Sequence, residues 1–297
     1  MSFQVTESMV QQYGANFRVL SQQKQSRLLP FCQMEGNIVG ASKSVERLGK
    51  AEAIRIDSRH SDTKFVEVPH SRRWLDVEDW TFAELVDELD KKKMLADPTS
   101  PYTALAVAAL NRRKDAIIYA ASRGTARTGT GTQALPSGQK IAHGSANLTL
   151  AKLLTAKEIL DAAEVDDDAS MSATGQANSE QATRVIVVNA KMLTSLYGTT
   201  EIKSVDYNSV KALAQGQIDT FLGFKFIRYE GLYKDGTATT GYATCWARSC
   251  MALGVGADVA TDISIRNDKN NAAQVYARMS LGAVRLEDEG VVEIACA

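Results

Sequence analysis

Residues 100–124 read SPYTALAVAALNRRKDAIIYAASRG, and this stretch decides what kind of fold the chain can adopt. Ser100 is a favourable residue just before a helix, and Pro101 suits the first helical position, where no backbone N–H is needed. No helix-breaking residue follows until Gly124, and glycine favours the position just after a helix end. The stretch therefore predicts one helix over 101–123, roughly 35 Å long and about twice the mean helix length of globular proteins.

Alanines and larger apolar residues share this predicted helix. Val107, Leu110, Ile117 and Ile118 supply an apolar stripe, and the many alanines allow neighbouring elements to approach closely. A single long helix of this kind is unusual for a small enzyme and suits an elongated, plate-like subunit. The alanines are Ala104, Ala106, Ala108, Ala109, Ala116, Ala120 and Ala121.

The segment before the long helix predicts another helix, over 81–95. Thr81 can cap its start, acidic residues follow early, and three lysines come late. That order of charges complements the helix dipole. Asp97 and Pro98 then end the segment.

Residues 49–80 predict a long, charged β-hairpin. Apolar and polar residues alternate around Ile54 and Ile56, the alternation resumes at 65–68, and the polar run 59–62 suits the tip. An isolated hairpin is only marginally stable in water, so a long charged one needs a surface to lie on. A neighbouring subunit could supply that surface, which is the first indication of assembly.

The beginning of the chain, residues 1–35, is a polar, Gln-rich arm. Its apolar residues have helical spacing, and Pro30 lies near its end. Such an arm can fold onto the body of its own chain or reach a neighbour, and the sequence leaves both alternatives open.

The rest of the chain mixes predicted helices and strands without the regular alternation of a Rossmann or barrel enzyme, which indicates the α+β class. Residues 124–147 are rich in Gly, Thr and Ser and predict a loop. Helices are predicted at 148–165, 190–197 (capped by Asn189), 209–215 and 243–253, and strands at 183–188, 224–227, 262–267, 274–286 and 291–295.

Composition excludes some classes of function. The chain has 297 residues with 34 basic and 35 acidic side chains, a net charge of −1. A protein that grips nucleic acid through its phosphates usually shows a basic excess, so tight binding of DNA or RNA is disfavoured. The four scattered cysteines predict reduced, buried thiols rather than a disulfide framework. No secretory signal or run of about 18 apolar residues occurs, so we expect no membrane contact and a cytoplasmic site of synthesis.

Motifs for catalysis or metal binding lack their structural context. Residues 127–132 contain a G-x-G fragment, but a helix rather than a strand precedes it, so a flexible loop is favoured. His60, His70 and His143 have no ligand spacing, and the consecutive aspartates 166–168 do not match a calcium loop. We therefore predict no catalytic residue, no cofactor and no metal.

Three segments, taken in this order, resemble the major capsid proteins of tailed bacteriophages. DKKKMLADPTSPY (90–102) with ALNRRKDAII (109–118) is similar to the entry into that family's long spine helix. Residues 216–227 are similar to the segment that enters a central strand of its axial domain. AAQVYARMSLGAVRLEDEGVVEI (272–294) is similar to the closing strands of its peripheral domain.

The resemblance implies a Hong Kong 97-type capsid fold, which is α+β. It implies these parts: an N-terminal arm (1–48), an extended β-hairpin loop (49–80), a peripheral domain (81–149 and 261–297) with the spine helix 101–123, and an axial domain (150–260).

The resemblance also implies a function. Copies of the chain would form pentamers and hexamers that build an icosahedral shell around the double-stranded DNA genome, with a portal protein at one vertex. Because the arm is short, a separate scaffolding protein is the expected helper, and packaged DNA would make weak, non-specific contact. The shell would be assembled in the bacterial cytoplasm and become part of the virion.

The charged hairpin, its tryptophans and the long helix supply the candidate contact residues between subunits. These are Arg55, Arg59, Arg72, Arg73, Trp74, Trp80, Arg113 and Asp115. Two alternatives stay open: an encapsulin-like compartment shell, and a soluble enzyme that uses 124–147 as a lid.

Overall fold

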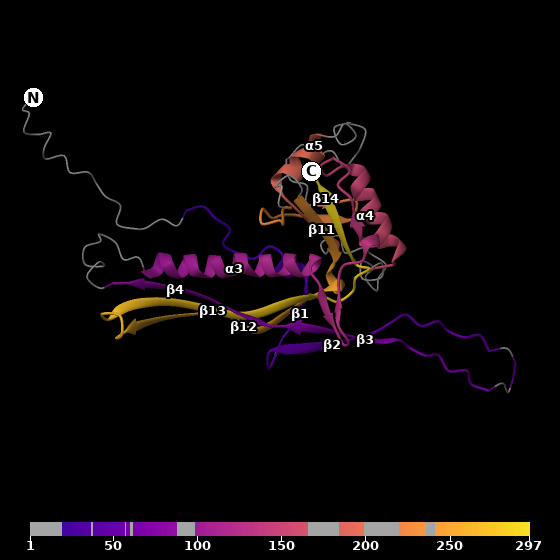
Figure 1. Ribbon diagram of the computed structural model, residues 1–297, viewed down its shortest axis with the longest axis horizontal. Helices are drawn as coiled ribbons and strands as arrows, with labels where there is room; N and C mark the ends of the chain where they lie inside the picture. Colours follow the sequence, from indigo (N-terminus) through magenta and orange to yellow (C-terminus); the bar gives the residue numbers. More distant parts are fainter. Residues whose placement is uncertain are drawn as a thin grey trace, which may run out of the picture. The chain divides into compact units, whose positions relative to one another are not determined.

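A computed structural model of the chain places its elements as drawn in Figure 1. It describes residues 20–36, 38–56, 58–59, 62–87, 99–165, 184–198, 220–235 and 241–297. The helical spacing predicted before residue 20 and the helix predicted at 209–215 lie outside these ranges. The chain divides into two compact units: unit 1 (Met1–Ser26, Asp79–Arg113, Ala257–Ser280) and unit 2 (Arg27–Glu78, Lys114–Gly256, Leu281–Ala297).

The predicted long helix is present as α3, Thr99–Arg123 (Figure 1). It ends where the sequence predicts and begins two residues earlier. The N–H of Gly124 donates to the carbonyl oxygen of Ala120 at 2.8 Å, and a Cβ on Gly124 would lie 2.9 Å from that oxygen. Glycine therefore fits the tight exit from the helix.

The helix predicted over 81–95 is wrong where the structure describes it. Residues 78–86 form strand β4 (Glu78–Val86), and the part of the predicted helix from residue 88 on lies outside the described residues. Trp80 and Phe82 are half-buried while Thr81 and Ala83 are exposed, which is the two-residue period of a strand. Hydrogen bonding to strand β13 outweighs the helix-like order of charges.

One four-stranded sheet has the order β1-β12-β13-β4. Strand β1 (Gln33–Glu35) pairs in parallel with β12 (Met251–Arg266), so this part of the N-terminal arm lies on its own chain. Strands β12 and β13 (Ala272–Arg285) include the predicted strands 262–267 and 274–286 and confirm them in their main extent.

The helix predicted at 243–253 is wrong. The segment contains strand β11 (Gly241–Ala247), the short 3-10 helix η3 (Arg248–Cys250) and the start of β12. Most of these residues are small or apolar and fully buried. A strand covered on both faces is a continuous apolar run, which periodicity alone cannot distinguish from a buried helix.

The six-stranded sheet has the order β7-β14-β11-β8-β10-β9 and lies wholly in unit 2. Its strand β14, predicted from the sequence at 291–295, is buried along its whole length. Helix α4 packs against β14 (Figure 1). The strands and helices not yet given are β7 (Lys140–Ile141), β8 (Arg184–Val188), β9 (Thr220–Phe221), β10 (Phe224–Arg228), β14 (Val291–Cys296), α4 (Leu150–Ala162) and α5 (Ala190–Gly198).

Helix α5 confirms the predicted cap, because the side-chain oxygen of Asn189 accepts a hydrogen bond from the N–H of Met192 at 2.8 Å. The predicted helix 148–165 is present as α4 in shorter form.

Strand β14 comes from the predicted peripheral domain, and it pairs with β11, which comes from the predicted axial domain. This sheet therefore combines residues of both predicted domains.

A second four-stranded sheet has the order β2-β3-β5-β6. Its strands are β2 (Ser42–Leu48), β3 (His70–Asp76), β5 (Ala126–Thr128) and β6 (Thr132–Gln133), the last two within the predicted loop 124–147. That loop also contains the 3-10 helix η2 (Ser137–Gln139), and the arm contains η1 (Leu29–Phe31). Six buried apolar residues form a core cluster that includes Leu75 of β3: Ile38, Leu75, Ala126, Ala252, Val284 and Leu286.

Candidate subunit interface

A hairpin is present, but its strands are not the predicted ones: β2 ends at Leu48, before the predicted range, and the described residues around 53–56 and 65–68 form no strand. Strands β2 and β3 pair from Ser42↔Asp76 to Leu48↔His70, and the N–H of Gly49 donates to the carbonyl oxygen of Pro69 at 2.8 Å. The described residues between them have no strand assignment. In Figure 1 both arms of this segment, here called the loop 50–68, continue past the end of the ladder.

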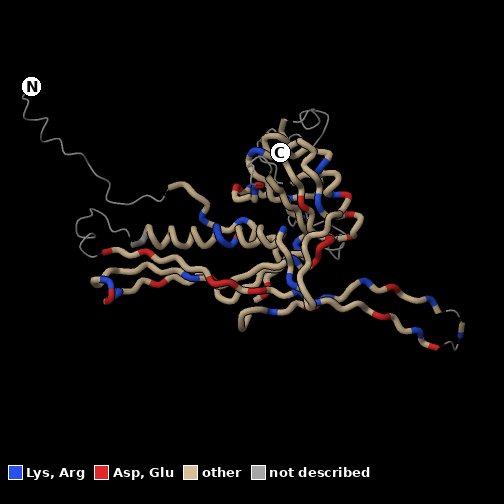
Figure 2. Tube along the Cα trace, viewed as in Figure 1, with Lys and Arg blue, Asp and Glu red and all other residues tan. Residues whose placement is uncertain are grey.

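The loop 50–68 exposes large apolar side chains. Phe65 is 90% exposed and Ile56 is 80% exposed, and Ile54, Val66 and Val68 are also exposed. Arg55 and Arg59 are exposed between them, and Figure 2 shows residues of both charge signs on both arms. Large apolar side chains gathered on one short exposed segment favour a protein-binding surface.

Exposed charges at the base of the hairpin pair across the strands. Arg72 binds Glu46 at 2.5 Å, and Arg127 binds Asp76 at 2.6 Å. The guanidinium carbons of Arg72 and Arg127 also lie 5.6 and 5.1 Å from the ring centre of the half-buried Trp74. These contacts hold the indole in place. Arg72 is exposed and Trp74 is half-buried, so both residues keep atoms that a neighbour could contact.

Trp80 and Arg113, both in unit 1, form a second candidate contact. The Arg113 guanidinium lies over the indole of Trp80, 3.7 Å from the ring centre, a distance typical of a cation–π contact. Arg113 is exposed and Trp80 is half-buried. From the sequence alone, Trp80 and Arg113 are separate candidates, and the structure places them in contact.

Two of the candidate residues are buried inside their own chain. The side chain of Arg73 binds Asp288 at 2.7 Å and is 6% exposed. The carboxylate of Asp115 is fully buried and accepts hydrogen bonds from the N–H groups of Arg27 and Leu28, each at 3.1 Å. Both residues hold segments of their own chain together.

The contacts of Asp115 show whether the described part of the arm folds onto its own chain or reaches a neighbour. Its bonds fix residues 27–28, and the indole N–H of Trp246 donates to the carbonyl oxygen of Phe31 at 2.9 Å. In unit 1, the side chain of Arg112 donates to the amide oxygen of Gln22 at 2.5 Å. These residues of the arm lie on their own chain.

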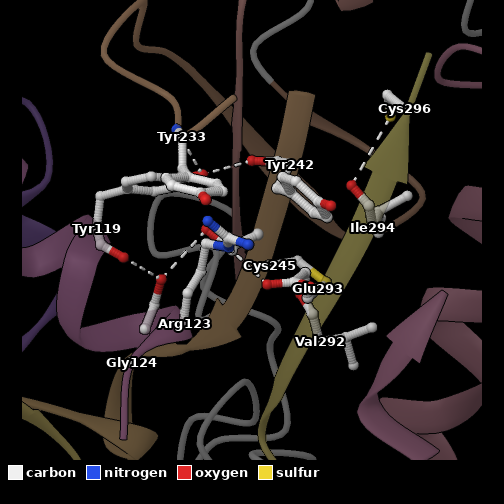
Figure 3. A network of polar contacts seen from close by, with 12 residues as sticks. Tyr119, Arg123, Gly124, Tyr233, Tyr242, Cys245, Val292, Glu293, Ile294 and Cys296 are labelled. Atoms are coloured by element: carbon white, nitrogen blue, oxygen red, sulfur yellow. Dashed lines mark hydrogen bonds and ion pairs between the residues drawn. The ribbon is translucent and has the colours of Figure 1, made fainter. Parts of the chain in front are cut away.

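A polar network joins the end of α3 to the six-stranded sheet (Figure 3). Arg123 binds Glu293 at 2.5 Å and lies near the rings of Tyr233 and Tyr242, at 4.5 and 4.2 Å. The hydroxyl of Tyr119 donates to the carbonyl oxygen of Tyr242 at 2.7 Å, and burial raises the pKa of Tyr119 to about 12. These contacts tie the last turn of α3 to strands β11 and β14.

The cysteines are reduced and buried, as predicted. Burial raises the pKa of the thiols of Cys32 and Cys245 to about 12 and that of Cys296 to about 11. The reactive form of cysteine is the thiolate, so at neutral pH these groups are poor nucleophiles.

The G-x-G fragment forms a tight turn between β5 and β6. The N–H of Thr128 donates to the carbonyl oxygen of Gly131 at 2.7 Å, and the N–H of Gly131 donates to the Thr128 hydroxyl at 3.0 Å. In the described part of the chain no group of three or more His, Cys, Asp or Glu residues could hold a metal ion. No helix there is long and apolar enough to cross a membrane.

Known proteins share the whole fold. The capsid protein of the cyanophage P-SCSP1u is 15% identical, with a TM-score of 0.70 over 99% of this chain and 94% of its own. That of the Helicobacter pylori bacteriophage KHP30 is 8% identical, with a TM-score of 0.73 over 100% of this chain and 97% of its own. These similarities confirm the predicted Hong Kong 97-type, α+β capsid fold.

Sequence comparison supplies the family. No curated protein matches the chain. The family model described as phage capsid protein matches residues 5–297, nearly the whole sequence. The chain therefore belongs to the phage capsid protein family.

Proposed function

We propose that this chain is the repeating subunit of a tailed bacteriophage shell, assembling as pentamers and hexamers into an icosahedral capsid around double-stranded DNA. The loop 50–68 carries the proposal. An isolated subunit gains nothing from exposing Ile56 and Phe65 to water, whereas covering each such side chain stabilises a complex by about 1.5–3 kcal/mol. A second copy of the chain is the partner that fits, since the chain carries 34 basic and 35 acidic residues and can pair with charges of either sign.

The charges of the loop would set the register between neighbouring copies. Charge complementarity contributes more to specificity and orientation than to affinity, and a net charge of −1 limits repulsion among many crowded copies. We assign Arg55, Arg59, Arg72 and the Trp80–Arg113 pair to contacts between subunits. The half-buried Trp74 would contribute through its exposed edge.

Further partners belong to the same proposal. A separate scaffolding protein would guide assembly in the host cytoplasm, a portal protein would occupy one vertex, and packaged DNA would touch the inner surface weakly. The absence of a basic excess in the sequence supports weak contact. The division into arm (1–48), loop (49–80), peripheral domain (81–149 with 261–297) and axial domain (150–260) is also proposed.

The test is assembly with and without the apolar surface of the loop. The full chain, co-expressed with its scaffolding protein, is expected to form closed particles in electron micrographs. The double variant Ile56→Ser, Phe65→Ser is expected to remain folded, with an unchanged melting temperature, but to stay unassembled. The matched control is Val39→Ser, which alters an apolar residue 95% exposed outside the loop and should still assemble.

Two results would contradict the proposal: dispersed subunits from the unmodified chain under all assembly conditions, or normal particles from the double variant. The content of the particles separates a virus shell from an encapsulin-like compartment, because the former would enclose DNA and the latter a protein cargo.

A further inference from the structure

Unit 2 contains a buried cluster with more positive than negative charge. Arg73 binds one oxygen of Asp288 at 2.7 Å, and Arg285 binds the other at 2.6 Å. Arg285 is fully buried, and its other N–H groups donate to the backbone oxygens of residues 122, 124 and 133. Two guanidinium groups therefore share one carboxylate, and a buried charge without a counter-charge is costly.

A cavity of about 500 Å³ adjoins this cluster. Arg47, Arg72 and Arg73 line it from strands β2 and β3, and the turn between β5 and β6 lines it with Thr128 and Thr130. Glu46 neutralises Arg72 at 2.5 Å. Within the described residues, no carboxylate forms an ion pair with Arg47.

Two of the guanidinium groups have polar atoms without a partner. Nη1 of Arg73, a residue only 5% exposed, and Nε of Arg47 are both buried and form no hydrogen bond with the described part of the chain. A buried N–H donor that lacks an acceptor destabilises the fold by about 1–3 kcal/mol, and more when it is charged. Both atoms belong to residues that line the same cavity.

We propose that this cavity binds an oxyanion. A phosphate or carboxylate group would accept hydrogen bonds from the unpartnered donors of Arg47 and Arg73 and would balance the surplus charge beside Asp288. Guanidinium groups suit this task because their planar N–H donors match the oxygens of such anions. The hydroxyls of Thr128 and Thr130 add neutral donors that tolerate either geometry.

The anion has two possible sources, which share this chemistry. It is either free phosphate from solution or a carboxylate side chain from a second copy of the chain. The second source rests on the proposed function, because it requires neighbouring copies in a shell. The first does not depend on assembly.

The first experiment measures thermal unfolding of the full-length, unassembled chain in sodium phosphate and in sodium chloride of equal ionic strength. At phosphate tenfold above its dissociation constant, the melting temperature should rise by about 2 °C. The variant Arg47→Gln should remove this rise and should not lower the melting temperature in chloride, because Arg47 has no ion pair to lose and its buried Nε has no hydrogen bond to lose. The control Arg278→Gln changes an exposed arginine outside the cavity and should keep the rise.

The second experiment measures particle formation by Arg47→Glu and by its control, Arg278→Glu. If phosphate has no effect on the free chain, but Arg47→Glu blocks assembly and Arg278→Glu does not, then the anion comes from a second copy. Assembly by the control also shows that the shell function itself is intact.

The proposal is overturned if phosphate gives no rise and Arg47→Glu assembles normally. If Arg47→Gln keeps the full rise, the rise is a general effect of the salt, and the proposal is then overturned if Arg47→Glu also assembles normally.

Discussion

Replacing Asp115 should release the arm from the body of the chain. The Asp115 carboxylate accepts from the N–H of Arg27 with both oxygens and from the N–H of Leu28 with one, each at 3.1 Å. Asp115→Ala removes these acceptors and leaves the N–H groups of Arg27 and Leu28 without them. Leu28 is fully buried. At about 1–3 kcal/mol for each orphaned donor, we expect a loss of about 2–6 kcal/mol of unfolding free energy.

The assay is equilibrium unfolding in urea, followed by tryptophan fluorescence. Trp246 is a suitable reporter because it is fully buried and its indole N–H binds Phe31 in the same segment of the arm. Asp115→Asn keeps one acceptor oxygen and should be less damaging, by about half. Brief trypsin treatment should cleave after Arg27 at least tenfold faster in Asp115→Ala than in the unmodified chain, because the bond is no longer held.

The matched control is Asp262→Ala, which removes an exposed carboxylate from strand β12. A surface change of this kind usually alters stability by less than about 0.5 kcal/mol. If Asp115→Ala unfolds at the same urea concentration as this control, the bonds to the arm contribute nothing measurable and the reasoning is refuted.

Three further predictions concern the interior of unit 2. In Gly282→Ala, the new Cβ would overlap a backbone oxygen of strand β3, so we expect the unfolding free energy to fall by about 3 kcal/mol in thermal unfolding. The control Gly138→Ala has open space around it and should be neutral; equal melting temperatures for the two variants would contradict this. Burial raises the pKa of Cys245 to about 12, so only about one Cys245 thiol in 10,000 is ionised at pH 8. Since all four cysteines are buried, a thiol reagent should label them only after denaturation, and rapid labelling of the native chain would contradict this prediction. Arg123→Ala leaves its carboxylate partner on β14 buried without a counter-charge and should destabilise the chain by about 3–5 kcal/mol in urea unfolding. A loss below about 1 kcal/mol would contradict this.

The elements that the sequence predicted well carry their own local signals. Pro101 and Gly124 mark the two ends of α3, and Asn189 marks the start of α5 through the bond to Met192. The alternation of Phe224 and Phe226 marks β10. In each case the residues that decide the structure are neighbours in the sequence.

The errors arise where distant partners decide. Residues 81–86 have the charge order of a helix start, yet strand β13, nearly 200 residues later, takes them into a sheet. The only local signal was the alternation of Trp80 and Phe82. Residues 243–253 look helical because nearly all are small or apolar, and their burial between neighbouring strands is not visible in the sequence.

The candidate contact residues show the same division. The exposure of Arg55 and Arg59 follows from the hairpin pattern, so sequence could place them on a surface. The burial of Arg73 depends on Asp288, and that of Asp115 depends on the backbone of the arm. The oxyanion cavity combines four strands and the turn at residue 288, so no single motif could have indicated it.

The order of the six-stranded sheet has a consequence for how fast the chain can reach its native state. Its strand β14 pairs with β7, about 150 residues earlier, and with β11, about 50 residues earlier. Chains dominated by such distant pairings lose much entropy before they gain contacts, and they fold slowly. A newly made subunit would therefore spend a long time with open strand edges, which are sites of aggregation. The slow step in producing competent subunits would then be the closure of this sheet, and the yield of refolding should fall as the protein concentration rises.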